Sequence, residues 1–192
     1  MTLSRENLLS LEDYSQQRSE FRARVLEHKR NRRVELAPHT NLYFEDALTM
    51  QYQIQEMLRI ERIFEAEGIQ EELDAYNPLI PDGSNWKATF MLEYDNPDER
   101  KSVLAKLIGV EDKVWVRVGE FDKVYAIADE DLERENEEKT SSVHFLRFEL
   151  SADMVEAAKT GTGISMGVDH PELSCFVAVA DAVRESLVGD LA

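Results

Sequence analysis

Apolar residues recur at helical spacing through the first third of the chain, and this pattern predicts helices there. A first helix is expected from Leu11 to about Lys29, a second from about Asp46 to Ala66, and a short third one from Ile69 to Tyr76. The second carries two adjacent apolar stripes, which indicates that it packs on more than one side. The first 84 residues therefore form a helical layer.

The pattern then changes to alternation of apolar and polar residues, which predicts strands. Two short extended pieces precede it between the first two helices, at 34–38 and 42–44. The strands are expected at Lys87–Tyr94, Ser102–Ile108, Val114–Val118, Lys123–Ala128, Val143–Leu150 and Ile164–Val168. Their spacing and turns are typical of an antiparallel meander.

Three further segments complete the picture. Ser151 is expected to cap a short helix that ends at Gly161. Asp169-His-Pro-Glu172 has the features of a helix start, so a terminal helix is predicted from there to about Leu187. The acidic run Asp129–Glu138 is interpreted as a solvated loop or an exposed helix. Together these elements predict an α+β fold, residues 1–192 as one domain, with a helical layer (1–84) and an antiparallel sheet with helices (85–192).

Composition narrows the class of protein. Hydrophobic residues make up 43% of the 192 residues, and no apolar run approaches the length of a membrane span. The single cysteine, Cys175, excludes an intramolecular disulfide and a Cys-x-x-Cys site. No secretory leader is visible, so a cytoplasmic protein is expected.

Charge is distributed unevenly. The net charge of −17 argues against a general nucleic-acid or anionic-lipid surface. Nevertheless, Arg18 to Arg33 holds seven basic and two acidic residues. Arg30, Arg32 and Arg33 could bind an anion or a partner, because the guanidinium matches phosphate and carboxylate. The favoured interpretation is that these arginines pair with acids of the second helix.

Candidate metal ligands are sparse. Glu56 and Glu61 lie among apolar positions of the second helix, but a di-iron site on a helical bundle needs Glu-x-x-His pairs, which the sequence lacks. His39, His144 and His170 are weak candidates, since no two histidines have ligand spacing on one helix. His144 alternates with apolar residues and is expected to be a core histidine with a hydrogen-bond partner. A mononuclear site that joins distant residues stays open, and no motif implies a cofactor.

One set of residues carries a resemblance to a known family. It comprises Lys29-x-x-Arg32-Arg33-Val34, Phe44-Glu45, Thr49, Gln55-Glu56-Met57-x-Arg59-x-Glu61, Glu72-Leu73-x-Ala-Tyr76-Asn77-x-Leu-Ile-Pro81 and Ala88-Thr89. Over about residues 12–95 these resemble a bacterial family of domains of unknown function, number 3501. The resemblance implies no activity. It marks one constellation of charged and polar residues: Arg32, Arg33, Glu45, Glu56, Arg59, Glu61, Tyr76 and Asn77.

The resemblance also implies a context, because genes of this family often lie beside those for rubrerythrin-like proteins and iron–sulfur oxidoreductases. The first hypothesis is therefore a non-catalytic accessory protein that docks on such a partner in redox or peroxide defence. The alternative is a metal-dependent or anion-binding enzyme with a site near Arg32, Arg33, Glu56 and Glu61. A structural homo-oligomer, for example a homodimer, is the third.

Overall fold

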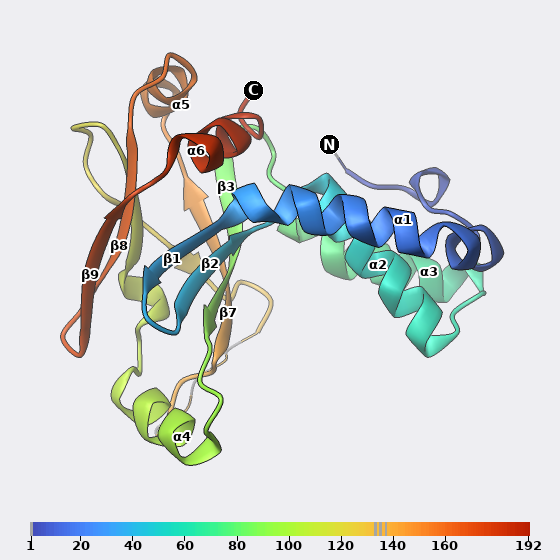
Figure 1. The fold of residues 1–192 in the computed structure, drawn as a ribbon, viewed down its shortest axis with the longest axis horizontal. Coiled ribbons are helices and arrows are strands. Elements are labelled where there is room, and N and C mark those ends of the chain that lie inside the picture. Colours follow the sequence, from blue (N-terminus) through green and yellow to red (C-terminus); the bar gives the residue numbers. More distant parts are fainter. Residues whose placement is uncertain (1, 133, 135, 137) are drawn as a thin grey trace.

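Alternating burial along the strands builds two antiparallel sheets that pack face to face, and a helical arm projects from them (Figure 1). The computed structural model describes residues 2–132, 134, 136 and 138–192. The arm consists of α1 (Leu11–Lys29), α2 (Ala47–Glu61) and α3 (Ala66–Tyr76). The α+β class, the antiparallel pairing and a C-terminal helix are thus confirmed.

The strands are divided between two sheets. The first has the order β1-β2-β3-β7-β6, with β1 (Arg33–Ala37), β2 (Thr40–Phe44), β3 (Asn85–Leu92), β7 (Val143–Glu149) and β6 (Ile127–Ala128). The second has the order β5-β4-β8-β9, with β5 (Val124–Tyr125), β4 (Val114–Val118), β8 (Ile164–His170) and β9 (Leu173–Ala178). Phe90 and Phe148 of the first sheet and Val116 and Met166 of the second are fully buried in one shared core.

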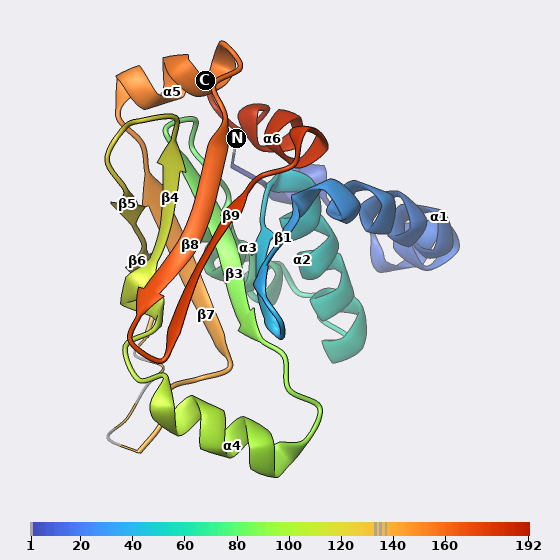
Figure 2. The ribbon, with the colours of Figure 1, turned by 60° about the vertical axis from the view of Figure 1, so that its left-hand side comes forward.

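Helices close the two ends of the sandwich (Figure 2). At one end lies α4 (Pro97–Lys106), and at the other lie α5 (Ala152–Lys159) and α6 (Asp181–Val188). Leu187 of α6 is buried in the sandwich core, and its carbonyl accepts a hydrogen bond of 2.8 Å from Trp86 Nε1. The indole N–H, which would be costly to bury alone, is thereby satisfied.

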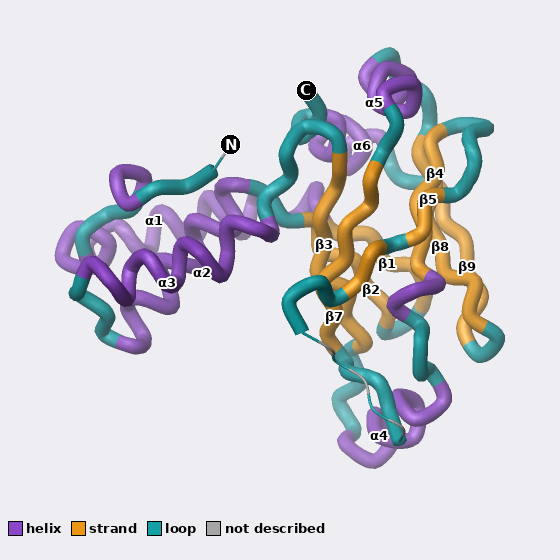
Figure 3. The backbone as a smooth tube through the Cα atoms, turned by 180° about the vertical axis from the view of Figure 1, so that it is seen from behind, coloured by secondary structure: helices purple, strands orange, loops and turns teal. Residues whose placement is uncertain are grey.

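The arm, whose backbone is seen from behind in Figure 3, has apolar clusters of its own. Ile54 of α2 and Leu73 of α3 belong to one, and Tyr14 of α1 belongs to another. The second helix ends earlier than predicted, because Arg62 adopts a left-handed backbone conformation (φ 57°) that stops α2. Within the described residues, no helix has both the length and the apolar character needed to cross a membrane.

The predicted strand at Ser102–Ile108 is wrong, because these residues lie largely in α4. The side chain of Asn96 accepts hydrogen bonds from the backbone N–H groups of Asp98 (2.9 Å) and Glu99 (3.2 Å). Pro97 occupies the first helical position, where its missing N–H costs nothing. Helix capping therefore outweighs the short apolar alternation that suggested a strand.

The predicted helix start at Asp169–Glu172 is also wrong. Asp169 and His170 end β8, a turn follows, and β9 returns as its antiparallel neighbour. The residues Leu173, Cys175 and Val177 face the core, while Phe176 between them is exposed. This period of two selects a strand, and the terminal helix is confined to α6. Cys175 consequently lies on a strand, where burial raises the pKa of its thiol.

Arg32 joins the arm to the sandwich. It lies in the 3₁₀ turn η2 (Arg30–Arg32) between α1 and β1, and its side chain is 2% exposed. Its guanidinium donates to the carbonyls of Phe44 and Glu45, both at 3.1 Å, where β2 leads into α2. It also donates to Ser186 O and Oγ (3.3 Å each) and to Asp190 Oδ2 at 2.6 Å, beside α6.

Two carboxylates balance this buried charge. Burial raises the pKa of Asp190 above its usual range, although Arg32 opposes this. Burial also disfavours ionised Asp46, but Arg32, the Thr49 N–H and His28 outweigh it and hold the pKa of Asp46 below its usual range. Asp46 also accepts a hydrogen bond of 2.9 Å from the Thr49 N–H, which caps α2.

We expect Arg32→Met to lower the free energy of unfolding by about 3–5 kcal/mol, because it leaves buried carboxylates and carbonyls without their donor. Urea denaturation followed by circular dichroism measures the change. Arg30→Met is the matched control, since Arg30 is exposed and its ion-pair partner among the described residues is the exposed Glu27. It should change stability by less than about 0.5 kcal/mol. Equal losses in the two variants would contradict the role given to Arg32.

Candidate functional site

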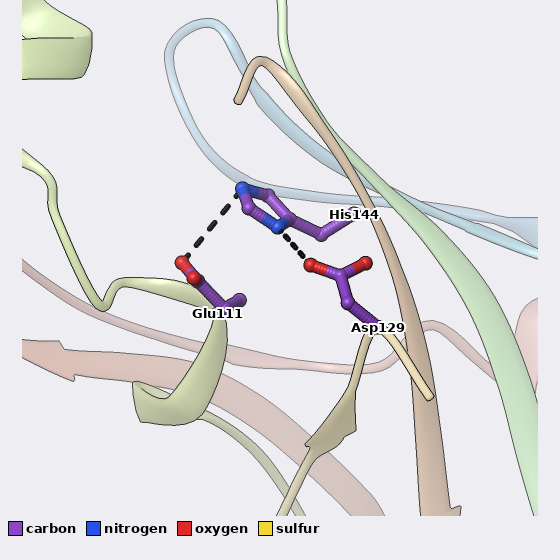
Figure 4. A group of neighbouring side chains, drawn as sticks. All are labelled: Glu111, Asp129 and His144. Carbon is purple, nitrogen blue, oxygen red and sulfur yellow. Dashed lines mark hydrogen bonds and ion pairs between the residues drawn. The ribbon is translucent and has the colours of Figure 1, made fainter. Parts of the chain in front are cut away.

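A histidine and two carboxylates meet inside the sandwich, at the end closed by α4. His144 comes from β7, Glu111 from the 3₁₀ turn η4 (Glu111–Lys113) before β4, and Asp129 follows β6 (Figure 4). His144 is fully buried, and the two carboxylates are nearly so. The prediction that His144 is a core histidine with a hydrogen-bond partner is confirmed.

Asp129 orients the imidazole. Its Oδ2 lies 2.6 Å from His144 Nδ1. Its Oδ1 accepts a hydrogen bond of 2.9 Å from the Phe145 N–H and one of 3.0 Å from Arg134 Nη1. The backbone of Asp129 is left-handed (φ 48°), a conformation that aspartate tolerates better than most residues. Both carboxylate oxygens are therefore engaged, and the ring of His144 is fixed.

Oxygen atoms gather around the other ring nitrogen. Within reach of His144 Nε2 lie Thr140 Oγ1 at 3.0 Å, Ser141 O at 3.1 Å and Glu111 Oε2 at 3.7 Å. Thr140 Oγ1 is in turn 3.3 Å from Glu111 Oε2. These contacts are compatible with hydrogen bonds between Nε2 and the neighbouring oxygens, and also with a cation that Nε2 and these oxygens share.

The order Asp129–His144–Thr140 has the connectivity of an Asp–His–hydroxyl triad. Thr140, however, is only 1% exposed, so its hydroxyl faces no substrate in this structure. The arrangement therefore supports nucleophilic catalysis poorly. Ion binding or a purely structural role fits the enclosed position better.

The sequence did not reveal this site as a whole. The interpretation of Asp129–Glu138 as a solvated loop or exposed helix is wrong for the carboxylate of Asp129, which is buried. Part of that run, Glu133, Glu135 and Glu137, lies outside the described residues. The sequence does contain one signal that Glu111 is buried: this residue lies between the apolar residues Val110 and Val114.

The residues marked by the family resemblance are distributed over several places. Arg32 joins arm and sandwich, whereas Arg33 lies on the exposed side of β1 and donates to Asn41 Oδ1 at 3.0 Å. Glu45 is buried and accepts hydrogen bonds from the hydroxyls of Thr49 (2.7 Å) and Thr89 (2.8 Å). These three residues thus have three different environments.

Asn77 and Tyr76 lie where the arm meets the first sheet. The amide of Asn77 pairs with the backbone of Leu3, accepting from its N–H at 2.8 Å and donating to its carbonyl at 2.9 Å.

Of the other histidines, His39 contacts Glu93 O at 2.8 Å and His170 contacts Ile108 O at 3.1 Å. The structure brings neither histidine to His144.

Glu56 is the centre of a network within the arm. Its carboxylate accepts hydrogen bonds from Arg18 Nε (2.7 Å) and Nη2 (2.9 Å), from the Tyr14 hydroxyl (2.6 Å) and from Arg59 Nη2 (3.3 Å). The Arg18 hydrogen bonds, with help from Tyr14 and Arg59 and against burial, lower the pKa of Glu56 to about 2. Glu61, by contrast, is exposed. The predicted pairing of the basic stretch with acids of the second helix is thus confirmed for Arg18. It is wrong for Arg30, which pairs with Glu27, and for Arg33, which pairs with Glu35.

Comparison with known proteins agrees with the resemblance. The family model described as a protein of unknown function (DUF3501) matches residues 2–191. A crystal structure at 1.90 Å resolution of a novel protein of unknown function from Burkholderia pseudomallei K96243 is 52% identical, with a TM-score of 0.95 over 100% of both chains. No curated protein matches the chain significantly.

We expect Glu56→Gln to lower stability at pH 7 by about 1 kcal/mol, a value discounted for the partial exposure of the network. Because the folded pKa of about 2 lies below the ordinary 4.5, the charge of Glu56 stabilises the fold above pH 4.5, and this contribution disappears as the pH falls towards 2. Urea denaturation of both proteins at several pH values measures the difference. Glu61→Gln is the matched control, and a pH-independent difference for Glu56→Gln would contradict the prediction.

Proposed function

Because the chain belongs to the DUF3501 family of proteins of unknown function, its sequence relatives supply no activity, and we propose from its structure that it binds one divalent metal ion between Glu111 and His144. The observation that carries the proposal is the ring of oxygen atoms around His144 Nε2. Thr140 Oγ1, Ser141 O and Glu111 Oε2 lie 3.0–3.7 Å from this nitrogen.

These separations suit a shared cation. Transition metals bind nitrogen and oxygen ligands at about 2.0–2.2 Å. Adjacent ligand atoms around one ion are consequently about 3.0–3.5 Å apart, by the geometry of tetrahedral and octahedral sites. The contact of 2.6 Å between Asp129 and His144 Nδ1 is a hydrogen bond instead.

Asp129 then has the position of an outer-shell carboxylate. Metal-binding histidines commonly donate their second ring N–H to a carboxylate, which fixes the tautomer and makes the other nitrogen a better ligand. Asp129 Oδ2 accepts in this way, and Arg134 balances its charge. The carboxylate of Glu111, which is buried, supplies an anionic oxygen ligand on the other side of the proposed ion.

The ligand set indicates the class of metal. Carboxylate, imidazole, hydroxyl and carbonyl groups without a thiolate suit Mn²⁺, Fe²⁺ or Zn²⁺. The site is enclosed, which is typical of ions that hold a fold together rather than turn over a substrate. The proposed ion therefore joins η4, β7 and the segment after β6.

We expect the purified protein to contain about one equivalent of metal when it is prepared without chelators. Added Mn²⁺, Fe²⁺ or Zn²⁺ at about 100 times the Kd should raise the Tm of chelator-treated protein by roughly 5–10 °C. Elemental analysis and differential scanning calorimetry measure the two quantities. Glu111→Gln should abolish both, because it removes an anionic ligand while keeping the shape of the side chain.

His39→Asn is the matched control, since it removes an exposed imidazole at a left-handed position that asparagine tolerates. It should keep both the metal and the increase in Tm. Substoichiometric metal in the wild-type protein, together with an unchanged Tm, would overturn the proposal. His144 would then be a structural residue held by its hydrogen bonds to Asp129 and Thr140.

We further propose that the protein is an accessory protein that docks on a redox partner through the free end of its arm. The observation that favours this is a pair of apolar side chains there, Ile60 (62% exposed) and Phe64 (64% exposed). Phe64 also borders a hollow of about 310 Å³, whose apolar lining includes Leu8, Leu11, Leu58, Ile63 and Ile69. Exposed apolar groups beside a hollow are typical of protein–protein contacts.

Context specifies the partner. Arg5 and Arg62 lie at this end of the arm together with Glu61, Glu65 and Glu67, so charges of both signs surround the apolar pair as a polar rim. The family resemblance implies rubrerythrin-like proteins and iron–sulfur oxidoreductases as neighbours. A partner of this class is therefore the proposed occupant of the arm end.

We expect tagged protein to recover a rubrerythrin-like or iron–sulfur protein from its host, identified by mass spectrometry. Replacing Ile60 and Phe64 together by serine should reduce recovery about tenfold or more, the loss expected for central contact residues. Leu26→Ser, on the side of the arm, is the matched control and should bind normally. Recovery of no redox protein, or equal recovery with the double variant, would contradict the proposal, as would a mass in solution showing that the arm end pairs two copies.

A further inference from the structure

A cavity of about 470 Å³ lies where the arm meets the outer face of the first sheet. Tyr76 at the end of α3 and Leu79 of the 3₁₀ turn η3 (Asn77–Leu79) line it from the arm. Phe145 lines it from β7. Two cations, Lys87 of β3 and Arg147 of β7, come from directly paired positions of adjacent strands. Apolar walls with a few convergent polar groups are typical of small-molecule sites.

Within the described residues, every charged side chain of the lining except Lys87 is hydrogen-bonded to another side chain. For Asp74 the donor is Gln70 Nε2 (2.8 Å), and the others are ion-paired. Arg147 makes two hydrogen bonds to Glu130 (2.8 and 2.9 Å) and one to Glu149 (2.5 Å). Asp131 accepts from Arg134 at 2.5 and 2.6 Å. Each of these charges already has a counter-ion. An incoming ligand would have to break these pairs before it could use them.

Lys87 is the exception. Its ammonium donates to the carbonyl of Pro78, and in the described part of the chain it forms no ion pair within 4.0 Å. Burial lowers the pKa of Lys87, which is the direction expected for a cation that lacks a close counter-ion. One carbonyl uses one of the three donors of an ammonium group, so two remain for a ligand.

From this geometry we propose that the cavity binds a small organic monocarboxylate, whose carboxylate contacts Lys87 and whose apolar body lies against Tyr76, Leu79 and Phe145. A volume of about 470 Å³ is within the range of small-molecule pockets. Phe145 and Tyr76 offer ring surfaces that suit an aromatic body. The site shares no residue with the proposed metal site.

The surrounding acids define which anions fit. Asp74, Glu130 and Asp131 also line the cavity, so its lining is not cationic as a whole. A second negative charge on the ligand would meet these carboxylates without a free cation to balance it. Monocarboxylates should therefore bind better than dicarboxylates of the same size. Tyr76, which the family resemblance marked without a role, acquires one as a wall of this site.

Isothermal titration of the full-length protein with phenylacetate tests the proposal. We expect saturable 1:1 binding, with phenylacetamide, the neutral isostere, and homophthalate, which adds a second carboxylate, binding at least tenfold more weakly. Hexanoate should bind as well, since the cavity accepts an aliphatic apolar body as well as an aromatic one. Absence of phenylacetate binding, or equal binding of phenylacetate and phenylacetamide, would overturn the proposal.

Variants locate the site. Lys87→Met should weaken phenylacetate binding at least tenfold, whereas Lys101→Met, an exposed lysine on α4, should leave it unchanged. Equal binding by wild type and Lys87→Met would also overturn the proposal, and Lys87 would then serve only to tether Pro78 to the sheet. If Lys87→Met does not fold, the comparison of phenylacetate with phenylacetamide on the wild-type protein still shows whether the cavity recognises a carboxylate. Glu111→Gln should bind phenylacetate normally, which separates this result from the metal-site experiment.

Discussion

The placement of the arm depends on one buried guanidinium. Arg32 lies where the chain leaves α1 for β1, and it contacts the point where the chain returns from β2 to α2. Its contact with Asp190 adds the end of the chain after α6. Burying an ion pair does not by itself stabilise a fold. The hydrogen bonds of Arg32 are directional, whereas apolar packing is not. They therefore fix how three separate segments meet, and hence the angle at which the arm leaves the sandwich.

Three polar networks of the described residues differ in their geometry, and this difference separates structure from chemistry. Around Arg32 and around Glu56, carboxylates face cations and hydroxyls in direct hydrogen bonds. Around His144, Asp129 contacts the imidazole and Arg134, while oxygen atoms of Thr140, Ser141 and Glu111 surround the other ring nitrogen. Of the three networks, this one offers a nitrogen and several oxygen atoms at separations that suit a shared cation. That is why the proposed ion is placed at His144 and not among the more numerous arginines and glutamates.

Much of the fold was predictable from the sequence, because long periodic segments such as α1 and β7 carry the signal of their own secondary structure. The errors fell where short segments were ambiguous. The apolar spacing in 102–108 is compatible with a strand, but the Asn96 cap selects a helix. At 169–172 an acid followed by proline has the pattern of a helix start, although the residues form a strand and a turn. The site was less predictable, since the partners of His144 are 15 and 33 positions away in Asp129 and Glu111. Asp129 reaches His144 through the pairing of β6 with β7, whereas Glu111 reaches it only when the two sheets pack.

The residues that carry the family resemblance and the proposed metal ligands lie at opposite ends of the sandwich. Arg32, Tyr76 and Asn77 surround the junction of arm and sheet, next to the α6 end, whereas His144 pairs with Phe90 towards the α4 end. The residues that carry the family resemblance, between about 12 and 95, thus attach the arm and form one wall of the Lys87 cavity. None of Glu111, Asp129 and His144 is among them. The attachment of the arm by Arg32 can therefore be varied without touching Glu111, Asp129 or His144. The cavity is closer to the metal site, because Arg134 contacts both Asp129 and the cavity residue Asp131.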